Sequence, residues 1–305
     1  METLAEVTEE ANKMKAYVAL DCGVTQSGSN IKGLTDVVGM VGNRLHLHIA
    51  HINSYCRGQV KDPVEEALEA LSLLKDRRNI QSESYLGIIN GTPGQCVNGA
   101  PSDGVTQDCL RLGGYPATED GLKQAITDGY CKVPFETGGE TVLLEKEEAL
   151  RAWVEAGTKR LVSFPVNVPA AAILLATRKD EEKRFIVNGI STDGGSTPRN
   201  VSVESGLALV RYGALSLEEL VTKLAWNPSR MFGMLSKGHL GLGADADVTV
   251  LDMTSGRAIM GIALGKVIMV DGVVVGRGGT VITTESGVKA VEKARLPSQI
   301  VGLSE

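Results

Sequence analysis

The fold is decided by the stretch Leu45-His46-Leu47-His48-Ile49-Ala50-His51-Ile52, an apolar run that carries three of the four histidines. Two segments with apolar residues at helical spacing, 31–42 and 62–74, flank it, and another strand-like run covers residues 84–89. Helices that alternate with strands form crossover units, in which the strands are parallel. The sequence therefore predicts an α/β fold around a parallel sheet, with residues 16–20 as the first strand.

The alternation is interrupted between residues 91 and 139, which are rich in Gly, Pro, Asp and Thr and contain few apolar runs. A connection of this length is uncommon unless it is functional, so we expect an insertion that acts as a lid or shapes a pocket. Regular order is expected to return with a helix over 146–156 and a strand over 160–164. A helix from Pro169 to about residue 183 and a strand over 185–191 follow.

The C-terminal part changes from helical to strand-like periodicity. A helix is predicted over 216–225, where Ser216 and Glu219 have the spacing of a capping box. Beyond residue 240 the apolar runs are short, and the Asp271-Gly272 pair between two valine-rich runs indicates a hairpin. The chain is therefore predicted to end in a β-rich tail.

The composition excludes several classes of protein. The 305 residues are 43% hydrophobic and carry a net charge of −6, which describes a globular protein without the basic surface that nucleic acid or an anionic membrane requires. No apolar stretch approaches the roughly 20 residues of a membrane span. The acidic N-terminal residues lack the pattern of a signal peptide, and five cysteines without a CxxC pair indicate free thiols. A cytoplasmic location is predicted.

The histidine cluster raises the hypothesis of a metal site. Side chains alternate along a strand, so His46 and His48 are expected on one face, and His51 on the other. All three therefore cannot bind one ion. In a barrel the carboxyl end of a strand faces the active site, which favours His51 as a ligand and leaves His46 and His48 as packed or hydrogen-bonded side chains.

A second candidate is Asp193, which follows the apolar strand 185–191 and precedes Gly194-Gly195. A carboxylate at this position could bind a metal and take a proton from its water. The alternative is ordinary turn chemistry, since Asp before Gly is common in turns. A third glycine-rich segment, 238–251, has neither a strand before it nor a helix after it, so it is predicted to be a turn and not a dinucleotide site.

Several motifs carry a resemblance to a known family. Residues 217–252 contain Asn227-Pro228-Ser229 and then the run Lys237-Gly238-His239-Leu240-Gly241-Leu242-Gly243-Ala244-Asp245-Ala246-Asp247. This segment resembles the C-terminal end of the amidohydrolase superfamily, among members of the isoaspartyl dipeptidase, D-aminoacylase and hydantoinase kind. Residues 49–53 resemble the sixth barrel strand of the family, whose His binds metal. Residues 191–194 resemble the eighth strand, whose Asp is both ligand and general base.

The resemblance implies the C-terminal half of a TIM-like (β/α)8 barrel, strands 5–8, over residues 1–239, with the insertion at about 91–139 and a small β-sandwich segment over 240–305. It implies a metal-dependent hydrolase of amide or cyclic amide C–N bonds in non-peptide substrates, with one or two divalent ions, expected to be Zn2+. The ligands would be His51 and Asp193, with Asp193 as the base. Asp21 would be a further ligand, at the end of the fifth strand where the family has His.

Substrate contacts are expected from the loops that follow these ligands. Asn53, Tyr55 and Arg57 come just after His51, and Arg57 could pair with a substrate carboxylate, the alternative being a solvated loop charge. Ser196 follows Asp193 and is a further candidate, with Thr197 and Arg199 as weaker ones.

A half barrel would expose two strand edges and an apolar interior to water. We therefore expect a second polypeptide to supply the first four strands and the remaining ligands, or the chain to be a fragment of a longer enzyme. Two alternatives stay open. The chain could be a non-catalytic scaffold or regulatory subunit of an amidohydrolase complex, which the absence of the fifth-strand His favours, or it could use a thiol mechanism through Cys56.

Overall fold

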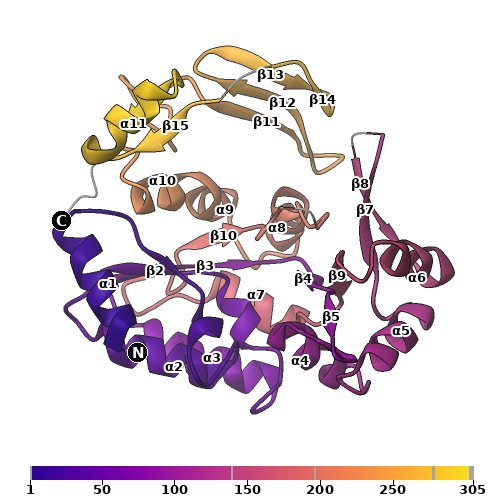
Figure 1. Ribbon diagram of the computed structural model, residues 1–305. Helices are drawn as coiled ribbons and strands as arrows, with labels where there is room; N and C mark the ends of the chain where they lie inside the picture. The colour runs from indigo at the N-terminus through magenta and orange to yellow at the C-terminus, as the bar shows by residue number, and fades with distance from the viewer. Residues whose placement is uncertain (1, 139, 196, 277–278, 302–305) are drawn as a thin grey trace.

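The structure is a computed structural model that describes residues 2–138, 140–195, 197–276 and 279–301. Its centre is a parallel sheet in the order β1 (Ala19–Leu20), β2 (Leu47–Ile49), β3 (Ile80–Tyr85) and β10 (Gly189–Ser191) (Figure 1). The order in the sheet is the order along the chain, so neighbouring strands are joined by crossover connections. The predicted α/β class is confirmed.

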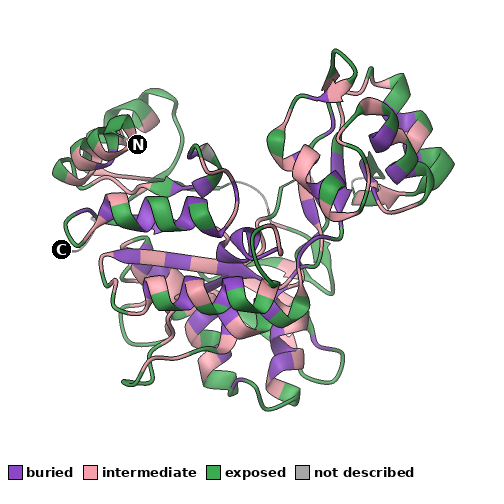
Figure 2. Ribbon diagram, turned by 90° about the horizontal axis from the view of Figure 1, so that it is seen from below, coloured by how far each residue is buried: buried purple, intermediate pink, exposed green. Residues whose placement is uncertain are grey.

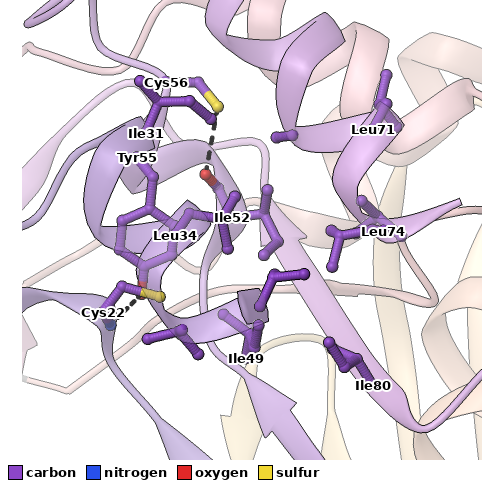
Figure 3. Packing of buried hydrophobic residues seen from close by; sticks show 14 of the residues in the cluster. Cys22, Ile31, Leu34, Ile49, Ile52, Tyr55, Cys56, Leu71, Leu74 and Ile80 are labelled. Atoms are coloured by element: carbon purple, nitrogen blue, oxygen red, sulfur yellow. Dashed lines mark hydrogen bonds between the residues drawn. The ribbon is translucent and has the colours of Figure 1, made fainter. Parts of the chain in front are cut away.

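Helices cover one face of this sheet. The helices are α1 (Glu2–Lys13), α2 (Ile31–Val41), α3 (Pro63–Leu74) and α7 (Pro169–Thr177). Two of them begin where a side chain satisfies free backbone N–H groups: Asn30 accepts hydrogen bonds at the start of α2, and Asp62 does so at the start of α3. Figure 3 shows Ile49 of the sheet packed among Leu34 of α2 and Leu74 of α3. Burial of each such side chain contributes about 1.5–3 kcal/mol, so this layer positions the strand ends firmly.

The insertion forms a lobe with its own core, set apart from the sheet in Figure 2. Its base is the antiparallel pair of β4 (Asn90–Pro93) and β9 (Leu161–Phe164). Between them lie β5 (Cys96–Val97), β6 (Ala100–Pro101), α4 (Gly104–Leu112), α5 (Glu119–Thr127), β7 (Val133–Thr137), β8 (Glu140–Leu144) and α6 (Lys146–Glu155). The segments expected to resume the barrel order after residue 139 belong to this lobe, because Trp153 and Phe164 are buried in the lobe's core.

Several predicted boundaries differ from the observed ones, three of them by four residues or more. The strand expected over 84–89 is β3, which begins at Ile80 and ends at Tyr85. Helix α7 ends at Thr177 and not near residue 183, and β10 begins at Gly189 and not at residue 185. An antiparallel bridge between Lys179 and Phe185 occupies the intervening residues, so they form a turn.

After β10 the chain forms α8 (Ser202–Arg211), α9 (Leu217–Val221), a π-helical turn η3 (Thr222–Trp226) and α10 (Asn227–Met231). The capping box of Ser216 and Glu219 is present at the start of α9, as predicted. Helices α8 and α9 pack on Ile190 of the sheet through Leu207 and Leu220. These contacts hold the loop that carries Asp193 against the sheet.

The tail contains an antiparallel sheet of β11 (Val248–Asp252), β12 (Arg257–Ala263), β13 (Lys266–Val270) and β14 (Val273–Val274). Asp271 and Gly272 both have positive φ angles between β13 and β14, so the predicted hairpin is confirmed. The remaining elements are a parallel pair, β15 (Val281–Thr283) and β16 (Ser298–Ile300), and α11 (Val288–Lys293). In the described ranges, every helix is too short or too polar to cross a membrane.

Candidate functional site

Acidic and histidine side chains meet where the parallel strands end. Asp21 follows β1, His51 lies two residues after β2, Glu83 is inside β3, and Asp193 lies two residues after β10. The carboxyl ends of parallel strands share one edge, so one sheet edge holds all four. His51 and Asp193 both have left-handed backbones, with φ angles of 37° and 45°. Such conformations cost about 1–3 kcal/mol for residues other than glycine and concentrate at functional sites.

The side chains of Asp21 and His51 approach each other. His51 Nε2 lies 3.6 Å from Asp21 Oδ2. The Tyr55 hydroxyl donates to Asp21 Oδ1 at 3.2 Å and accepts the backbone N–H of Cys22 at 3.0 Å, which holds the Asp21 carboxylate in place. His51 Nδ1 is buried and has no hydrogen-bond partner among the described residues. The pair thus presents one imidazole and one half-exposed carboxylate to the site.

Glu83 connects two of the strands and was missed by the sequence analysis. Its Oε1 accepts the backbone N–H of His51 at 2.6 Å, and its Oε2 accepts the Ser191 hydroxyl. Burial raises the pKa of Glu83, and the charge of Asp193 raises it further. The predicted strand began at residue 84, so Glu83 was placed outside it. A carboxylate flanked by Ser82 and Ser84 inside a strand was the signal that could have found it.

The three histidines in and beside β2 have different environments. His48 is buried, its Nδ1 is hydrogen-bonded to the Tyr17 hydroxyl, and its Nε2 lies 3.9 Å from Glu83 Oε1. Burial lowers the pKa of His48 to about 4, with a further contribution from His51. His46 is exposed. The alternation of side chains between the two faces of the strand does not extend to His51, because the left-handed backbone of His51 turns the chain. The backbone N–H of His51 donates to Glu83, the same carboxylate that the His48 ring approaches.

Asp193 is bound by an arginine. Arg199 Nη2 lies 2.8 Å from Asp193 Oδ2, and the Arg199 side chain is almost completely buried. Thr197 is buried as well. Ser196, predicted to contact substrate, lies outside the described residues. The backbone of Asp193 therefore has a turn conformation, as the alternative prediction states, while its carboxylate forms an ion pair with Arg199.

The other predicted substrate residues lie inside the protein. Tyr55 is fully buried in the main core (Figure 3), and Asn53 Oδ1 accepts the Ser84 hydroxyl at 3.1 Å and the Tyr85 N–H at 3.0 Å. Direct contact of either with a substrate stays a prediction. Arg57 is only 4% exposed, so the alternative of a solvated loop charge is wrong.

The described residues do not form a complete metal site. Among them, no three His, Cys, Asp or Glu side chains are grouped so that they could hold an ion. Asp21 and His51 could be two ligands, because two atoms bound at tetrahedral angles to one zinc ion are about 3.4 Å apart. All five cysteines are free, and burial raises the pKa of the Cys56 thiol far above its ordinary range, which argues against a thiol mechanism.

Comparison with known proteins gives partial matches. No protein-family profile matches the chain. A dihydroorotase of Syntrophus aciditrophicus is 43% identical over 76 residues, which cover 25% of this chain and 16% of the relative. A dihydroorotase of Methanothermobacter thermautotrophicus is 32% identical over 103 residues, covering 26% of this chain and 24% of the relative. The aligned parts span less than a quarter of these relatives, so the relatives' activity does not transfer directly.

Solved structures match over most of the chain. A D-aminoacylase with a binuclear metal centre superposes with a TM-score of 0.58 at 14% identity, over 90% of this chain and 57% of its own. An N-acyl-D-glutamate deacylase of Bordetella bronchiseptica, complexed with zinc and a phosphonate inhibitor, gives a TM-score of 0.55 at 11% identity. The match covers 98% of this chain and 58% of the deacylase. The formyltransferase/hydrolase complex FhcABCD of Methylorubrum extorquens gives a TM-score of 0.53 at 15% identity, over 95% and 55%.

These matches confirm the resemblance to the amidohydrolase superfamily. The chain has the α/β fold of these enzymes over 90% or more of its residues and corresponds to a little more than half of each.

Proposed function

We propose that the chain is part of a metal-dependent hydrolase of amide or cyclic amide C–N bonds in small, non-peptide substrates, located in the cytoplasm. The observation that carries the proposal is the convergence of Asp21, His51, Glu83 and Asp193 at the carboxyl edge of a parallel sheet. The names of the similar proteins support the reaction class, since a D-aminoacylase, an N-acyl-D-glutamate deacylase and dihydroorotases all act on such bonds.

In this proposal Asp193 is the general base. Its carboxylate takes the proton of the attacking water and returns it to the leaving nitrogen, which is the role of a positioned base in acyl transfer. Glu83 fixes the backbone N–H of His51, while Tyr55 orients Asp21. Asn53, Tyr55, Arg57 and Ser196 are the proposed substrate-contacting residues; in the structure Asn53, Tyr55 and Arg57 are buried.

The metal would be one or two divalent ions such as Zn2+. Asp21 and His51 are the proposed ligands, since their side chains already lie 3.6 Å apart. Asp193 would become a ligand only after its ion pair with Arg199 breaks. A zinc site usually has four ligands, one of them a water in catalytic sites, so Asp21 and His51 alone do not complete it.

The missing donors are proposed to come from a second polypeptide that carries the first half of a barrel. Within the described residues β1 and β10 are the edge strands of the sheet, with β1 paired only to β2 and β10 only to β3. Near the amino ends of β1, β2 and β3 a hollow of about 340 Å³ is lined by Tyr17, His48 and Gln81, among others. Barrel strands 1–4 would fill this hollow and close both edges.

The proposed division of the chain follows from this arrangement. Residues 1–239 would contain strands 5–8 of a TIM-like barrel, with the insertion extended from the predicted 91–139 to the end of β9, and residues 240–305 would be a segment of a small β-sandwich. The alternative is a non-catalytic scaffold or regulatory subunit. It is favoured by the ion pair with Arg199, which binds the carboxylate of the proposed base Asp193. It is also favoured by Asp21, which stands at the end of the proposed fifth strand in place of the His of the family.

The test is hydrolysis of dihydroorotate and of N-acyl-D-glutamate by the purified protein with added Zn2+, alone and with any co-purifying chain. Asp193→Asn should lower the rate by about 10²–10⁴-fold, the usual contribution of a general base. Asp271→Asn, in the hairpin turn, is the matched control and should leave the rate unchanged. Unchanged hydrolysis in Asp193→Asn, together with no bound zinc, would leave only the scaffold function.

The partner is tested separately by the mass of the complex in solution. The half-barrel proposal expects the chain to co-purify with a second polypeptide or to aggregate when alone. A soluble monomer that unfolds in a single two-state transition would contradict it.

A further inference from the structure

The hollow near the amino ends of β1, β2 and β3 is lined by residues from several parts of the chain. They come from the end of α1 and the residues before β1, from the starts of β2 and β3, and from α10. His48 and Gln81 are register partners in β2 and β3, so their side chains share one face of the sheet. The volume of about 340 Å³ lies within the range of ligand pockets, roughly 300–1,000 Å³. The hollow is therefore large enough to take side chains of another molecule.

The lining of this hollow is basic, although the whole chain carries a net charge of −6. Among the described residues, no Asp or Glu belongs to the lining, and the side chains in it that can be positively charged are those of Lys15, His46, His48 and Arg230. A cleft lined by one sign of charge attracts groups of the opposite sign. The hollow thus favours an anionic occupant.

Arg230 is held in place with part of its guanidinium unused. Its Nη2 donates to the carbonyl of Leu235 at 3.2 Å and to that of Lys237 at 3.3 Å. The guanidinium lies over the Trp226 ring, 4.2 Å from its centroid. Arg230 Nε is buried without a hydrogen-bond partner, and Nη1 makes no hydrogen bond with the described residues. Two nitrogens of a fixed guanidinium are left for an acceptor.

Arg230 also has no counter-ion in the described part of the chain. Asp245 and Asp247 follow it in sequence, but both pair with Lys237, at 2.9 Å and 2.5 Å. The side-chain amide of Gln81 makes no hydrogen bond with a described residue either, so it adds a further donor to the hollow. Polar groups removed from water are unfavourable until they are paired. A carboxylate, which only accepts hydrogen bonds, would satisfy both the charge and the donors.

We propose that a segment of the second polypeptide places an Asp or Glu side chain in this hollow, where its carboxylate pairs with Arg230 and accepts a hydrogen bond from Gln81. The inference rests on the proposed function, which supplies that polypeptide, and adds the chemistry of the contact. The position of the hollow supports it, because Tyr17 and Val18 of the lining lie just before β1, whose outer edge is unpaired. A strand that pairs with this edge runs past the hollow.

The ion pair also sets the register of the partner. Side chains alternate between the faces of a strand, so a shift by one residue turns every side chain to the other face. A partner strand shifted in this way points its carboxylate away from the hollow and leaves Arg230 without a counter-ion. Electrostatic complementarity of this kind contributes specificity and suppresses wrong pairings.

The contact is tested by cross-linking in the complex of this chain with its co-purifying polypeptide. Arg230→Lys keeps the positive charge and supplies an amine, which a carbodiimide joins to a carboxylate in contact with it, the carbodiimide leaving as a urea. We expect mass spectrometry of the digested complex to find position 230 joined to an Asp or Glu of the second polypeptide. Arg151→Lys, at an exposed position on the insertion, is the matched control and should form no such link.

The result that would overturn the proposal is an intact complex in which position 230 forms no link, as expected if a small anion or water fills the hollow. A link only to a carboxylate of this chain or of a second copy of it would overturn it as well.

A second variant leaves Arg230 and its contacts with the carbonyl groups unchanged. Gln81→Glu places a carboxylate of nearly the same shape in the hollow, so it competes for Arg230 and repels the acid of the partner. We expect the dissociation constant of the complex to rise by about 10-fold or more. Gln95→Glu, at an exposed position on the insertion, is the control and should leave the dissociation constant unchanged. Unchanged or tighter binding in Gln81→Glu would contradict the proposal.

The two proposals fail in different ways. If the mass of the purified protein shows no second polypeptide, the half-barrel proposal and this inference are both wrong. If a second polypeptide is bound but neither the cross-link nor the effect of Gln81→Glu is found, the carboxylate contact alone is wrong.

Discussion

The parallel sheet and the C-terminal sheet are both rich in Val and Ile, yet their side chains are in opposite environments. Ile49 and Ile190 of the parallel sheet are buried beneath helices. In the C-terminal sheet Val267, Val273 and Val274 are exposed by 44%, 63% and 76%. Figure 1 shows α2, α3 and α7 lying along the parallel sheet, whereas β13 and β14 lie at the outer side of the molecule.

This difference shows that an apolar sequence predicts where a strand forms but does not predict which elements pack against it. The crossover connections of the parallel sheet contain helices that pack on its face. The C-terminal strands are joined by hairpins, which place no helix on the sheet. The insertion lies between these extremes, since it is a local excursion that closes a core of its own. Large exposed apolar patches are typical of surfaces that take part in protein–protein contacts.

The largest effect is expected in the core of the insertion. Trp153 is fully buried there and donates from Nε1 to the carbonyl of Gly94 at 3.0 Å. Trp153→Ala should cost about 3–5 kcal/mol and expose the amides of α4, α5 and α6 to hydrogen exchange. Amides of α2, which belongs to a different core, should stay protected. Val154→Ala, at an exposed position on the same helix, is the control. Equal loss of protection in α2 would show that the two cores unfold as one.

A smaller effect is expected from His48 in the parallel sheet. Burial lowers the pKa of His48 from 6.5 to about 4 in the folded state. Between these values the unfolded chain binds a proton that the folded chain does not, so stability rises with pH through this window and is lost on acidification. The contribution is at most about 3 kcal/mol.

The measurement is the free energy of unfolding in urea at about pH 7 and at about pH 4.5. His48→Gln should reduce the loss of stability between the two pH values. His46→Gln, at the exposed position of the same segment, should lose as much stability as the wild type. An unchanged pH dependence in His48→Gln would mean that His48 is not buried in its neutral form.

Local patterns account for the features that the sequence could predict. Apolar periodicity located the four parallel strands, and the capping box of Ser216 depends on residues three apart. His51 and Asp193 were predicted because each follows an apolar strand, and the structure places both after strands of the parallel sheet. Features that depend on distant residues were not found: the pairing of β4 with β9 extends the insertion, and the contact of Glu83 with Ser191 joins two strands far apart in the sequence.

The smallest effect tests the comparison of the two sheets directly. Val274→Thr replaces a methyl group by a hydroxyl on an exposed edge strand and should change the free energy of unfolding by less than about 0.5 kcal/mol. The same change at Val187, which is fully buried in the main core, should cost about 1–3 kcal/mol because its hydroxyl is removed from water. Both are measured by urea unfolding of the chain alone. If the two substitutions cost the same, the C-terminal face is covered in solution. If Val274→Thr becomes costly only when a second polypeptide is bound, that polypeptide is what covers the sheet, and the absence of helices on this face is explained by the assembly.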